Sequence, residues 1–237
     1  KLPAGKGTAK RAIIMLKRAA AIKKFVKEND ICTAYSFTHA PNEALALSGA
    51  KCVKYISCRD YVRLIKSSKL YSFALRHGCN ILFNALEMQK KCEEMFPGNE
   101  DKLFTAYNII DCEKAREDAK EELDEEYKKF YDTHRVIAFS SRFVDQKCQW
   151  DMLKSFELLK KDIPDAGLIF LGCRGEYENA VREMAKKSEY SNDIVFAGFQ
   201  KNVFKFVSRA DVFAMTSYYE GFPNVIVEAL AVGTPAV

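Results

Sequence analysis

The sequence contains no apolar run long enough to cross a bilayer. A membrane-spanning helix needs about 20 apolar residues, and the most apolar stretch near the end, residues 225–232, is interrupted by Glu228. Residues 1–30 are basic but lack the long apolar segment and small-residue cleavage site of a secretory signal. We therefore expect a cytoplasmic protein that does not span a membrane.

No CxxC pair occurs among the eight cysteines, and the three histidines do not form a zinc-ligand spacing with them. Zinc sites and disulfide frameworks usually show such spacings. The sequence therefore predicts reduced, mostly buried thiols, with no metal site and no disulfide.

Several catalytic and binding signatures are also absent. The glycine pattern G-x-G-x-x-G of nicotinamide sites does not occur, and neither does the G-x-S-x-G turn of serine hydrolases. Basic and aromatic residues do not alternate in any recognisable nucleic-acid module. These absences argue against a dehydrogenase, a hydrolase and a nucleic-acid-binding protein.

The composition is that of an ordinary globular chain, with 237 residues, 48% hydrophobic and 29% charged residues, and a net charge of +5. The charge is uneven, since residues 1–30 hold nine Lys or Arg. Apolar residues recur there at helical spacing and predict a basic amphipathic helix. One interpretation is a helix that packs on the core with a solvated basic face. The other is a face that meets a phosphate-bearing acceptor or anionic lipid, the latter as peripheral contact at the inner face of a membrane.

Short apolar runs alternate with longer helical patterns along the whole chain. This alternation predicts an α/β protein with parallel sheets covered by helices. The expected strands are residues 31–37, 52–57, 80–84, 103–107, 135–140, 168–172, 194–198 and 212–216. The expected helices are residues 8–28, 42–49, 60–74, 85–96, 112–130, 149–161, 176–188, 201–208 and 223–232.

A charge-rich segment, residues 111–129, separates two α/β halves and predicts a solvated helix between them. We therefore expect two domains, residues 1–112 and 113–237. The first strand follows a lone helix, and residues 234–237 look like the start of another strand after the C-cap Gly233. Both sheets are therefore expected to be incomplete, as in a fragment of a longer protein.

The strongest motif is SYYEGFPNVIVEALAVGTP at residues 217–235. It predicts a loop after a buried strand, then a helix with Pro223 in its first turn. The amides at the start of such a helix suit a phosphate, and ligands of α/β sheets bind at the edge where the strands end. The carboxylates of Glu220 and Glu228 could accept hydrogen bonds from sugar and ribose hydroxyls.

A second motif, SSRFVDQK at residues 140–147, directly follows another strand. It places Arg142 and Lys147 at the same edge of the sheet. Two fixed cations there could stabilise the charge of a departing diphosphate.

Together the two motifs resemble the retaining glycosyltransferases of the GT-B fold, in particular the family 4 or group 1 type that builds bacterial surface polysaccharides. Glu220 and Glu228 keep the spacing of that family's two glutamates, and Arg142 and Lys147 match its cationic pair. The resemblance implies two Rossmann-like domains that face a cleft. It also implies that the cations stabilise the leaving diphosphate, that Glu220 holds the donor sugar, and that Glu228 binds the ribose.

Further segments fit the same family. LGCRGE at residues 171–176 is similar to its glycine-bearing loop, NIID at residues 108–111 to the end of its first domain, and residues 199–202 to its nucleobase contact. The other donor-binding residues that the resemblance implies are Ser141, Gly172, Phe199, Gly221, Phe222, Pro223 and Asn224.

The sequence departs from the family pattern at three positions. Ser141 and Cys148 stand where glycines are usual, and Ile109 stands where a proline is usual. A side chain in place of glycine affects how closely the backbone approaches a phosphate. The departures therefore concern the geometry of the donor loop.

The acceptor side is expected in the first domain, in loops that follow strands. His39 and Asn42 lie in such a segment, residues 36–42, and Arg59 follows the next strand. His39 could orient an acceptor or contact the sugar, and Asn42 and Arg59 are weaker acceptor-side candidates. Each could equally be an ordinary solvated side chain.

The resemblance implies hexosyl transfer from a UDP- or GDP-linked sugar to a glycan or lipid-linked acceptor, with retention of configuration. No D-x-D pair occurs, so the metal-dependent route of the other main glycosyltransferase fold has no obvious ligand pair. The resemblance implies that no metal and no cofactor other than the donor is needed. A sugar phosphorylase or synthase of the same fold, or a non-catalytic homologue that binds nucleotide or glycan, would share these features. A fragment need not be active by itself.

Overall fold

The computed structural model describes residues 8–172 and 174–237. Cys173 lies outside the described residues, as do residues 1–7 of the predicted first domain. The contacts divide the chain into two compact units. The first unit runs to Asn108 and also includes Glu220–Phe222, and the second comprises Ile109–Tyr219 and Pro223–Val237.

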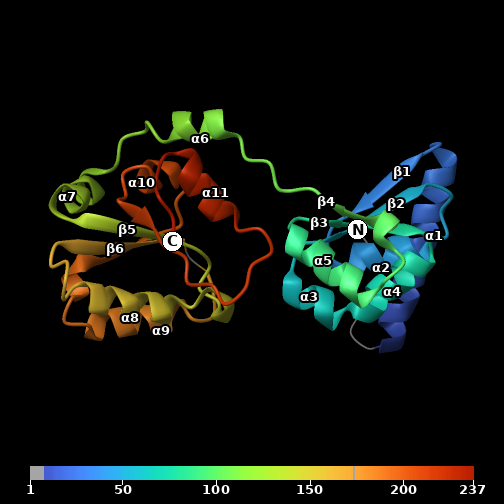
Figure 1. The fold of residues 1–237 in the computed structure, drawn as a ribbon, viewed down its shortest axis with the longest axis horizontal. Coiled ribbons are helices and arrows are strands. Elements are labelled where there is room, and N and C mark those ends of the chain that lie inside the picture. Colours follow the sequence, from blue (N-terminus) through green and yellow to red (C-terminus); the bar gives the residue numbers. More distant parts are fainter. Residues whose placement is uncertain (1–7, 173) are drawn as a thin grey trace. The chain divides into compact units, whose positions relative to one another are not determined.

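The first unit is built on a parallel four-stranded sheet in the order β1-β2-β3-β4 (Figure 1). Its strands are β1 (Thr33–Ser36), β2 (Val53–Cys58), β3 (Cys79–Phe83) and β4 (Leu103–Thr105). Its helices are α1 (Thr8–Glu28), α2 (His39–Leu47), α3 (Tyr61–Lys66), α4 (Ser68–Arg76) and α5 (Leu86–Met95), with a short 3-10 turn η1 (Glu100–Lys102).

One face of this sheet carries the core of the first unit. Ile56 and Ile81 point from the sheet into a cluster with Leu64, Tyr71 and other residues of the helices, and all four are at most 2% exposed. Side chains on the opposite face remain accessible, and Tyr35 and Phe104 are 51% and 41% exposed. The rings of Tyr35 and Tyr55 stack there with centroids 4.8 Å apart.

The second unit also has a parallel four-stranded sheet, in the order β7-β6-β5-β8. Its strands are β5 (Arg135–Ser140), β6 (Ala166–Leu171), β7 (Ile194–Gly198) and β8 (Val212–Phe213). Its helices are α6 (Cys112–Asp118), α7 (Glu125–Thr133), α8 (Gln149–Leu159), α9 (Glu178–Lys187), α10 (Phe204–Val207) and α11 (Asn224–Ala231), with 3-10 turns η2 (Asp145–Lys147) and η3 (Ser191–Asp193).

Helices cover both faces of this second sheet (Figure 1). Ile137 and Phe139 of β5 pack with α8 and α9, whereas Val136 and Ala138 of the same strand pack with α7, α10 and α11. A strand with two covered faces needs apolar residues at every position, which explains its continuous hydrophobic run. Each fully buried large side chain of this kind stabilises the fold by about 1.5–3 kcal/mol.

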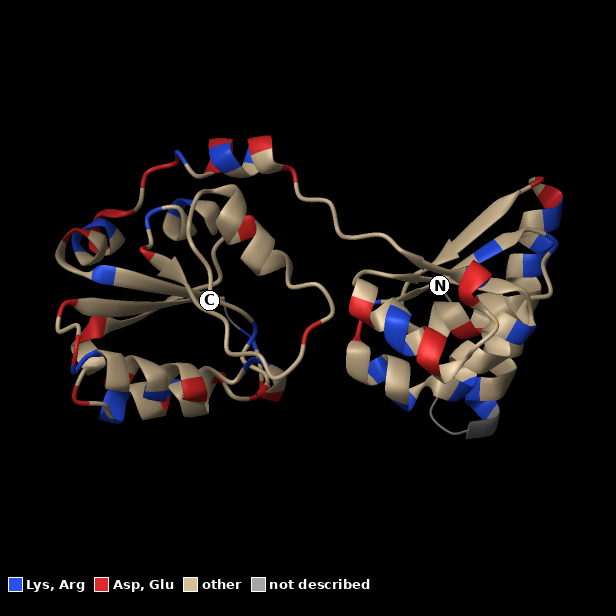
Figure 2. Ribbon diagram, in the orientation of Figure 1, with Lys and Arg blue, Asp and Glu red and all other residues tan. Residues whose placement is uncertain are grey.

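The predicted α/β class with parallel sheets is confirmed, but two predicted helices are each divided into two. The segment at 60–74 forms α3 and α4, which meet at Ser67. The segment at 112–130 forms α6 and α7, because residues 119–124 leave the helical path and bury Leu123 in the core. Figure 2 shows acidic and basic residues on both α6 and α7, as expected for solvated helices.

The strand predicted at residues 234–237 is reduced to one bridge, between Phe213 and Ala236. Among the described helices, none combines the length and the apolar character needed to cross a membrane.

The seven described cysteines carry free thiols. Burial raises the pKa of Cys58 to about 11 and that of Cys92 to about 12. Both thiols therefore stay protonated at neutral pH and have little nucleophilic character.

Candidate functional site

Four loops meet at the carboxyl edge of the second sheet, since all four strands are parallel. The loop after β5 is joined to β6, where the Ser141 amide donates to the Leu171 carbonyl at 3.1 Å. The loop after β6 is joined to β7, where the Gly172 amide donates to the Gly198 carbonyl at 2.7 Å. The predicted donor-binding segments of β5, β6 and β7 therefore lie side by side.

Gly172 and Gly175 allow two of these loops to come into close contact. Gly172 has a φ of +120°, and a Cβ there would lie 2.3 Å from the Ser141 carbonyl oxygen. A Cβ on Gly175 would lie 1.8 Å from the Phe143 carbonyl oxygen. Only glycine fits either position, because real Cβ atoms do not approach an oxygen so closely. Gly172 thus shapes the loop that carries Arg142.

Gln149, which was not among the predicted site residues, holds the loop after β5 that carries Arg142 and Lys147, called the cationic loop below. Its side chain is fully buried, and its amide nitrogen donates to the Ser141 hydroxyl at 2.9 Å and to the Arg142 carbonyl at 2.6 Å. Arg142 itself is exposed, and Lys147 is half-buried at the end of η2. A buried glutamine at the start of a helix leaves no distinct signal in a single sequence.

Cys148 occupies the left-handed backbone region, with a φ of 50° and a ψ of 46°. This explains why the resembling family favours glycine at this position, since a side chain in that conformation costs about 1–2 kcal/mol. The loop keeps the shape because the Thr216 hydroxyl donates to the Lys147 and Cys148 carbonyls, at 3.1 and 3.0 Å. Ser141 is not among the residues with positive φ, so its replacement of glycine needs no strained backbone.

The loop that leads to Glu220 is tied to the cationic loop. The Tyr218 amide donates to the Gln146 carbonyl at 2.9 Å, and the Gln146 side-chain amide donates to the Tyr219 carbonyl at 2.7 Å. The Ser217 hydroxyl is buried with no hydrogen-bond partner among the described residues. The structure thus joins residues 145–148 and 216–219, which lie far apart in the sequence.

The three residues Glu220, Gly221 and Phe222 group with the first unit, whereas the helix that follows belongs to the second. Pro223 caps this helix, with a φ of −77° and a ψ of 91°, and α11 begins at Asn224. The prediction of Pro223 inside the first turn is therefore wrong by one residue, because its ψ is extended.

Glu228 lies in the second turn of α11 and is half-buried. Burial raises the pKa of its carboxyl group. No hydrogen bond to this carboxylate occurs within the part of the chain that the structure describes. A half-buried acid of this kind is available to hydroxyl donors.

Phe199 follows β7 and is 75% exposed. Gly198 turns the chain there with a φ of +69°. The ring is therefore free to stack on a nucleobase. The end of the predicted base segment is wrong, because the Asn202 side chain donates to the Asp118 carbonyl at 2.7 Å and to Glu121 at 3.1 Å.

The acceptor-side candidates lie in the first unit, and one of them is corrected. Asn42 is 1% exposed, accepts from the Ser36 hydroxyl at 2.7 Å and donates to the Ser57 carbonyl at 2.8 Å. Its side chain therefore links β1 to β2 inside the core and cannot contact an acceptor.

His39 and Arg59 remain accessible at the carboxyl edge of the first sheet. His39 is the first residue of α2 rather than part of a loop, and its Nδ1 lies 3.4 Å from a Glu43 carboxylate oxygen. Arg59 is exposed and donates to the Asn108 side chain at 2.6 Å. No cluster of His, Cys, Asp and Glu that could hold a metal ion occurs among residues 8–172 and 174–237.

Sequence comparisons show that parts of this chain are similar to known glycosyltransferases. The family model "Glycosyl transferases group 1" matches residues 120–237. An uncharacterized glycosyltransferase of Methanocaldococcus jannaschii is 29% identical over 167 residues, which cover 70% of this chain and 41% of the relative. A GDP-mannose-dependent mannosyltransferase of Corynebacterium glutamicum, which acts on a monoacylated phosphatidylinositol monomannoside, is 32% identical over 117 residues, 46% of this chain and 30% of the relative. The chain spans less than half the length of both relatives.

Solved structures show the same fold at low sequence identity. The Anabaena protein HepE, in complex with UDP and glucose, superposes with a TM-score of 0.78 at 17% identity, over 99% of this chain and 64% of HepE. TarM superposes with a TM-score of 0.78 at 15% identity, over 94% of this chain and 44% of TarM. The chain thus covers part of the GT-B fold that these structures share, and its residues 120–237 match the model of the glycosyl transferases group 1 family.

Proposed function

We propose that the protein transfers a hexosyl group from a UDP- or GDP-linked sugar to a hydroxyl of a glycan or lipid-linked acceptor. The observation that carries this proposal is the carboxyl edge of the second sheet, where Arg142 and Lys147 share one hydrogen-bonded framework with the loop before Glu220. This edge lies within the residues that the family model matches, at the place where α/β sheets bind ligands.

The proposed chemistry breaks the bond between the anomeric carbon and the diphosphate oxygen. Negative charge then gathers on the diphosphate, where Arg142, Lys147 and the first amides of α11 stabilise it. The acceptor hydroxyl forms the new bond to the anomeric carbon and gives up its proton to the departing diphosphate. Glu220 holds the sugar, Glu228 holds the ribose, and His39 orients the acceptor.

The resemblance to retaining enzymes further suggests that the configuration at the anomeric carbon is kept, and that no metal or other cofactor takes part. We propose that the reaction takes place in the cytoplasm, at the inner face of the membrane if the acceptor is a lipid. HepE was solved with UDP, and the Corynebacterium relative is GDP-mannose-dependent.

The proposal is tested by calorimetric titration of the full-length protein with UDP, GDP and ADP. One nucleotide is expected to bind, and the Arg142→Ala, Lys147→Ala double variant to bind it at least about 100-fold more weakly. The reason is that a hydrogen bond to a charged group contributes about 1.5–3 kcal/mol. The control is a Lys154→Ala, Lys161→Ala variant, which removes two exposed lysines of the same unit. Absence of binding by all three nucleotides, or equal binding by both variants, would contradict the proposal.

A second test uses the raised pKa of Glu228. Ribose hydroxyls donate to the carboxylate form, so a bound nucleotide should lower this pKa and release a proton. The affinity for the nucleotide is then expected to rise with pH through the pKa of the free protein. Glu228→Gln should weaken binding at neutral pH and remove this part of the pH dependence, leaving only that of the nucleotide phosphates.

The raised pKa of Glu228 also predicts how Glu228→Gln changes the stability of the fold. The pKa of such a carboxyl group is higher in the folded protein than in the unfolded chain. At pH values below the unfolded pKa the protonated group gives its full contribution to stability, and this contribution is lost as the pH rises through the folded pKa. At neutral pH Glu228→Gln should therefore leave the fold as stable as before or more stable. Weaker nucleotide binding together with a loss of stability would show instead that Glu228 has a structural role.

A further inference from the structure

Two cysteines face each other at the amino edge of the first sheet. Cys32 directly precedes β1, and Cys52 directly precedes β2. The two strands pair in parallel with Thr33 opposite Val53, and the Val53 amide donates to the Cys32 carbonyl at 2.9 Å. The pairing therefore extends to Cys32, and one step back along both strands places Cys32 opposite Cys52.

The spacing of the two backbones suits a covalent link between these cysteines. Neighbouring strands of a sheet lie about 4.7–4.9 Å apart, and a disulfide joins Cα atoms about 4.4–6.8 Å apart. Residues opposite each other on paired strands also point to the same face of the sheet. The register therefore brings Cys32 and Cys52 within the range of a disulfide, although both carry free thiols in the structure.

The surroundings of Cys52 support the same placement. Burial raises the pKa of the Cys52 thiol, the Lys54 ammonium group lowers it, and the Cys32 thiol raises it further. The effect of one group on another weakens with distance, so the thiols of Cys32 and Cys52 lie close together. The Lys54 side chain is fixed beside them, because its ammonium group donates to the His77 carbonyl at 2.8 Å.

Accessibility distinguishes this pair from other thiols of the first unit. Cys32 is exposed and Cys52 is half-buried, whereas Cys58, Cys79 and Cys92 are at most 1% exposed. A dissolved oxidant reaches an exposed thiol directly and does not reach a thiol inside the core. Among the described cysteines of the first unit, oxidation is therefore expected to begin at Cys32.

We propose that Cys32 and Cys52 form a thiol modification site, which a small disulfide such as oxidised glutathione converts into an intramolecular disulfide. The Cys32 sulfur attacks the oxidant, releases one glutathione thiol and keeps the other glutathione as a mixed disulfide. The Cys52 sulfur then displaces that second glutathione thiol and forms the bond to Cys32. In total two electrons and two protons pass from the protein to the oxidant, and a reducing thiol reverses both steps. The inference does not depend on the proposed function.

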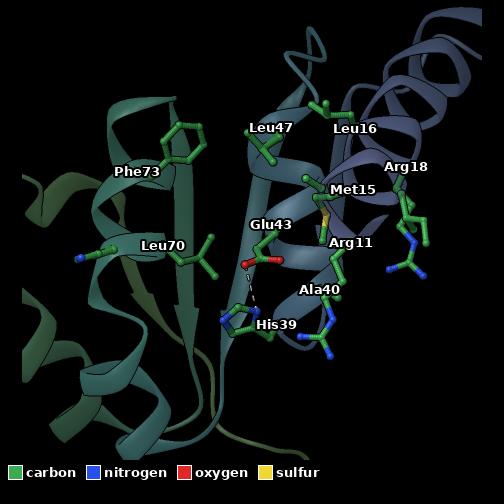
Figure 3. Close-up of a pocket in the computed structure, with 13 residues that line it drawn as sticks. Arg11, Met15, Leu16, Arg18, His39, Ala40, Glu43, Leu47, Leu70 and Phe73 are labelled. Carbon is green, nitrogen blue, oxygen red and sulfur yellow. Dashed lines mark ion pairs between the residues drawn. The ribbon is translucent and has the colours of Figure 1, made fainter. Parts of the chain in front are cut away.

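The link would lie away from the acceptor-side candidates. Cys32 precedes β1 at the amino edge of the sheet, whereas His39 begins α2 after β1, at the carboxyl edge. Figure 3 shows His39, Glu43 and Leu47 along α2, where they line a groove together with residues of α1 and α4. A bond at the amino edge closes the segment that contains β1 and α2, and it leaves these side chains in place.

The test is a peptide map of the full-length protein after incubation with oxidised glutathione. Free thiols are blocked by alkylation, and the protein is then cleaved with trypsin. Cleavage after Lys27, Lys51 and Lys54 separates residues 28–51, which contain Cys32, from residues 52–54, which contain Cys52. We expect these two peptides to be joined, with a mass lower than their sum by two hydrogen atoms.

Two substitutions locate the reaction. Cys52→Ser removes the second thiol and is expected to trap glutathione on Cys32. The unchanged protein should hold at least about tenfold less glutathione on Cys32 than this variant, because a thiol on the neighbouring strand acts at a high effective concentration. The matched control is Cys112→Ser, which removes a half-buried thiol of the other unit and should leave the link unchanged. Circular dichroism checks that each variant is folded.

The inference is overturned if Cys32 of the unchanged protein stays unlinked after this incubation, or if it is joined to a cysteine other than Cys52. It is also overturned if the unchanged protein retains as much glutathione on Cys32 as Cys52→Ser does. A link that forms in the unchanged protein and in Cys112→Ser, and that a reducing thiol removes, supports it.

Discussion

Replacing Lys160 by methionine is expected to lower the free energy of unfolding of the second unit by about 3 kcal/mol. The Lys160 side chain is 4% exposed, and its ammonium group lies 2.7 Å from an Asp193 carboxylate oxygen. It also donates to the Ala166 carbonyl at 3.1 Å and to the Pro164 carbonyl. Methionine keeps much of the volume but leaves the two carbonyls without this donor, and it leaves Asp193 with the His134 ring but without the ammonium group. We expect the low end of the range for a broken buried pair, because the Asp193 side chain stays 27% exposed.

This loss can be measured by urea unfolding followed through Trp150, the single tryptophan of the sequence. Trp150 lies on α8 and packs edge-to-face against Tyr177, so its fluorescence reports on the second unit. The control is Lys161→Met, a substitution of the exposed neighbouring lysine, which should change stability by less than about 0.5 kcal/mol. If both variants change the free energy of unfolding by a similarly small amount, the ion pair of Lys160 and Asp193 does not stabilise the second unit as predicted.

The same ion pair also predicts a pH dependence. Burial by itself would raise the pKa of Asp193, but the hydrogen bonds from Lys160 and His134 outweigh it and hold that pKa below its usual value. A lowered folded pKa contributes stability above the unfolded pKa, and this contribution is lost as the pH falls through the folded pKa. The difference in stability between the unchanged protein and Lys160→Met should therefore shrink in acid.

Replacing Gly172 by alanine is expected to destabilise the second unit by about 3 kcal/mol and to weaken nucleotide binding at least about tenfold. The φ of +120° is strained for any side chain, and the new Cβ would lie 2.3 Å from the Ser141 carbonyl oxygen. That oxygen belongs to the backbone of the cationic loop, so the loop must move and take Arg142 with it.

The matched control is Gly233→Ala, in the same unit. Gly233 also has a positive φ, +89°, but a Cβ there would meet no atom within 4 Å. Alanine at this position should cost only the backbone strain, about 1–2 kcal/mol, and leave nucleotide affinity unchanged. If the two variants behave alike, the close approach of the loops has no role in the site.

The sequence predicted the regular elements well where a single physical signal defines them. The ranges of α1, β5 and β7 agree with the structure residue for residue. For the two strands, a continuous apolar run ends at polar residues or at a glycine. The helix breaks at Ser67 and at residues 119–124 were not predicted, because helical spacing of apolar residues continues across both.

The candidate site was predictable in part. Motif spacing pointed to the cationic loop and to the loop before Glu220, but their hydrogen-bonded connection through Gln146 and Thr216 depends on the order of strands in the sheet. Asn42 was misplaced because a buried amide that links two strands looks, in the sequence, like a polar residue of a loop. Gln149 was missed because a buried glutamine at the start of a helix looks, in the sequence, like an exposed one.

Cys148 bears on how related loops can be recognised. A search pattern that demands glycine after the lysine would reject this chain, although its backbone turns in the left-handed direction that the glycine would allow. What the loop must keep at this position is a pair of dihedral angles and not a residue type. A residue that tolerates them, held by neighbours such as Thr216, satisfies the requirement. Patterns written in backbone angles would therefore collect members that patterns written in letters leave out.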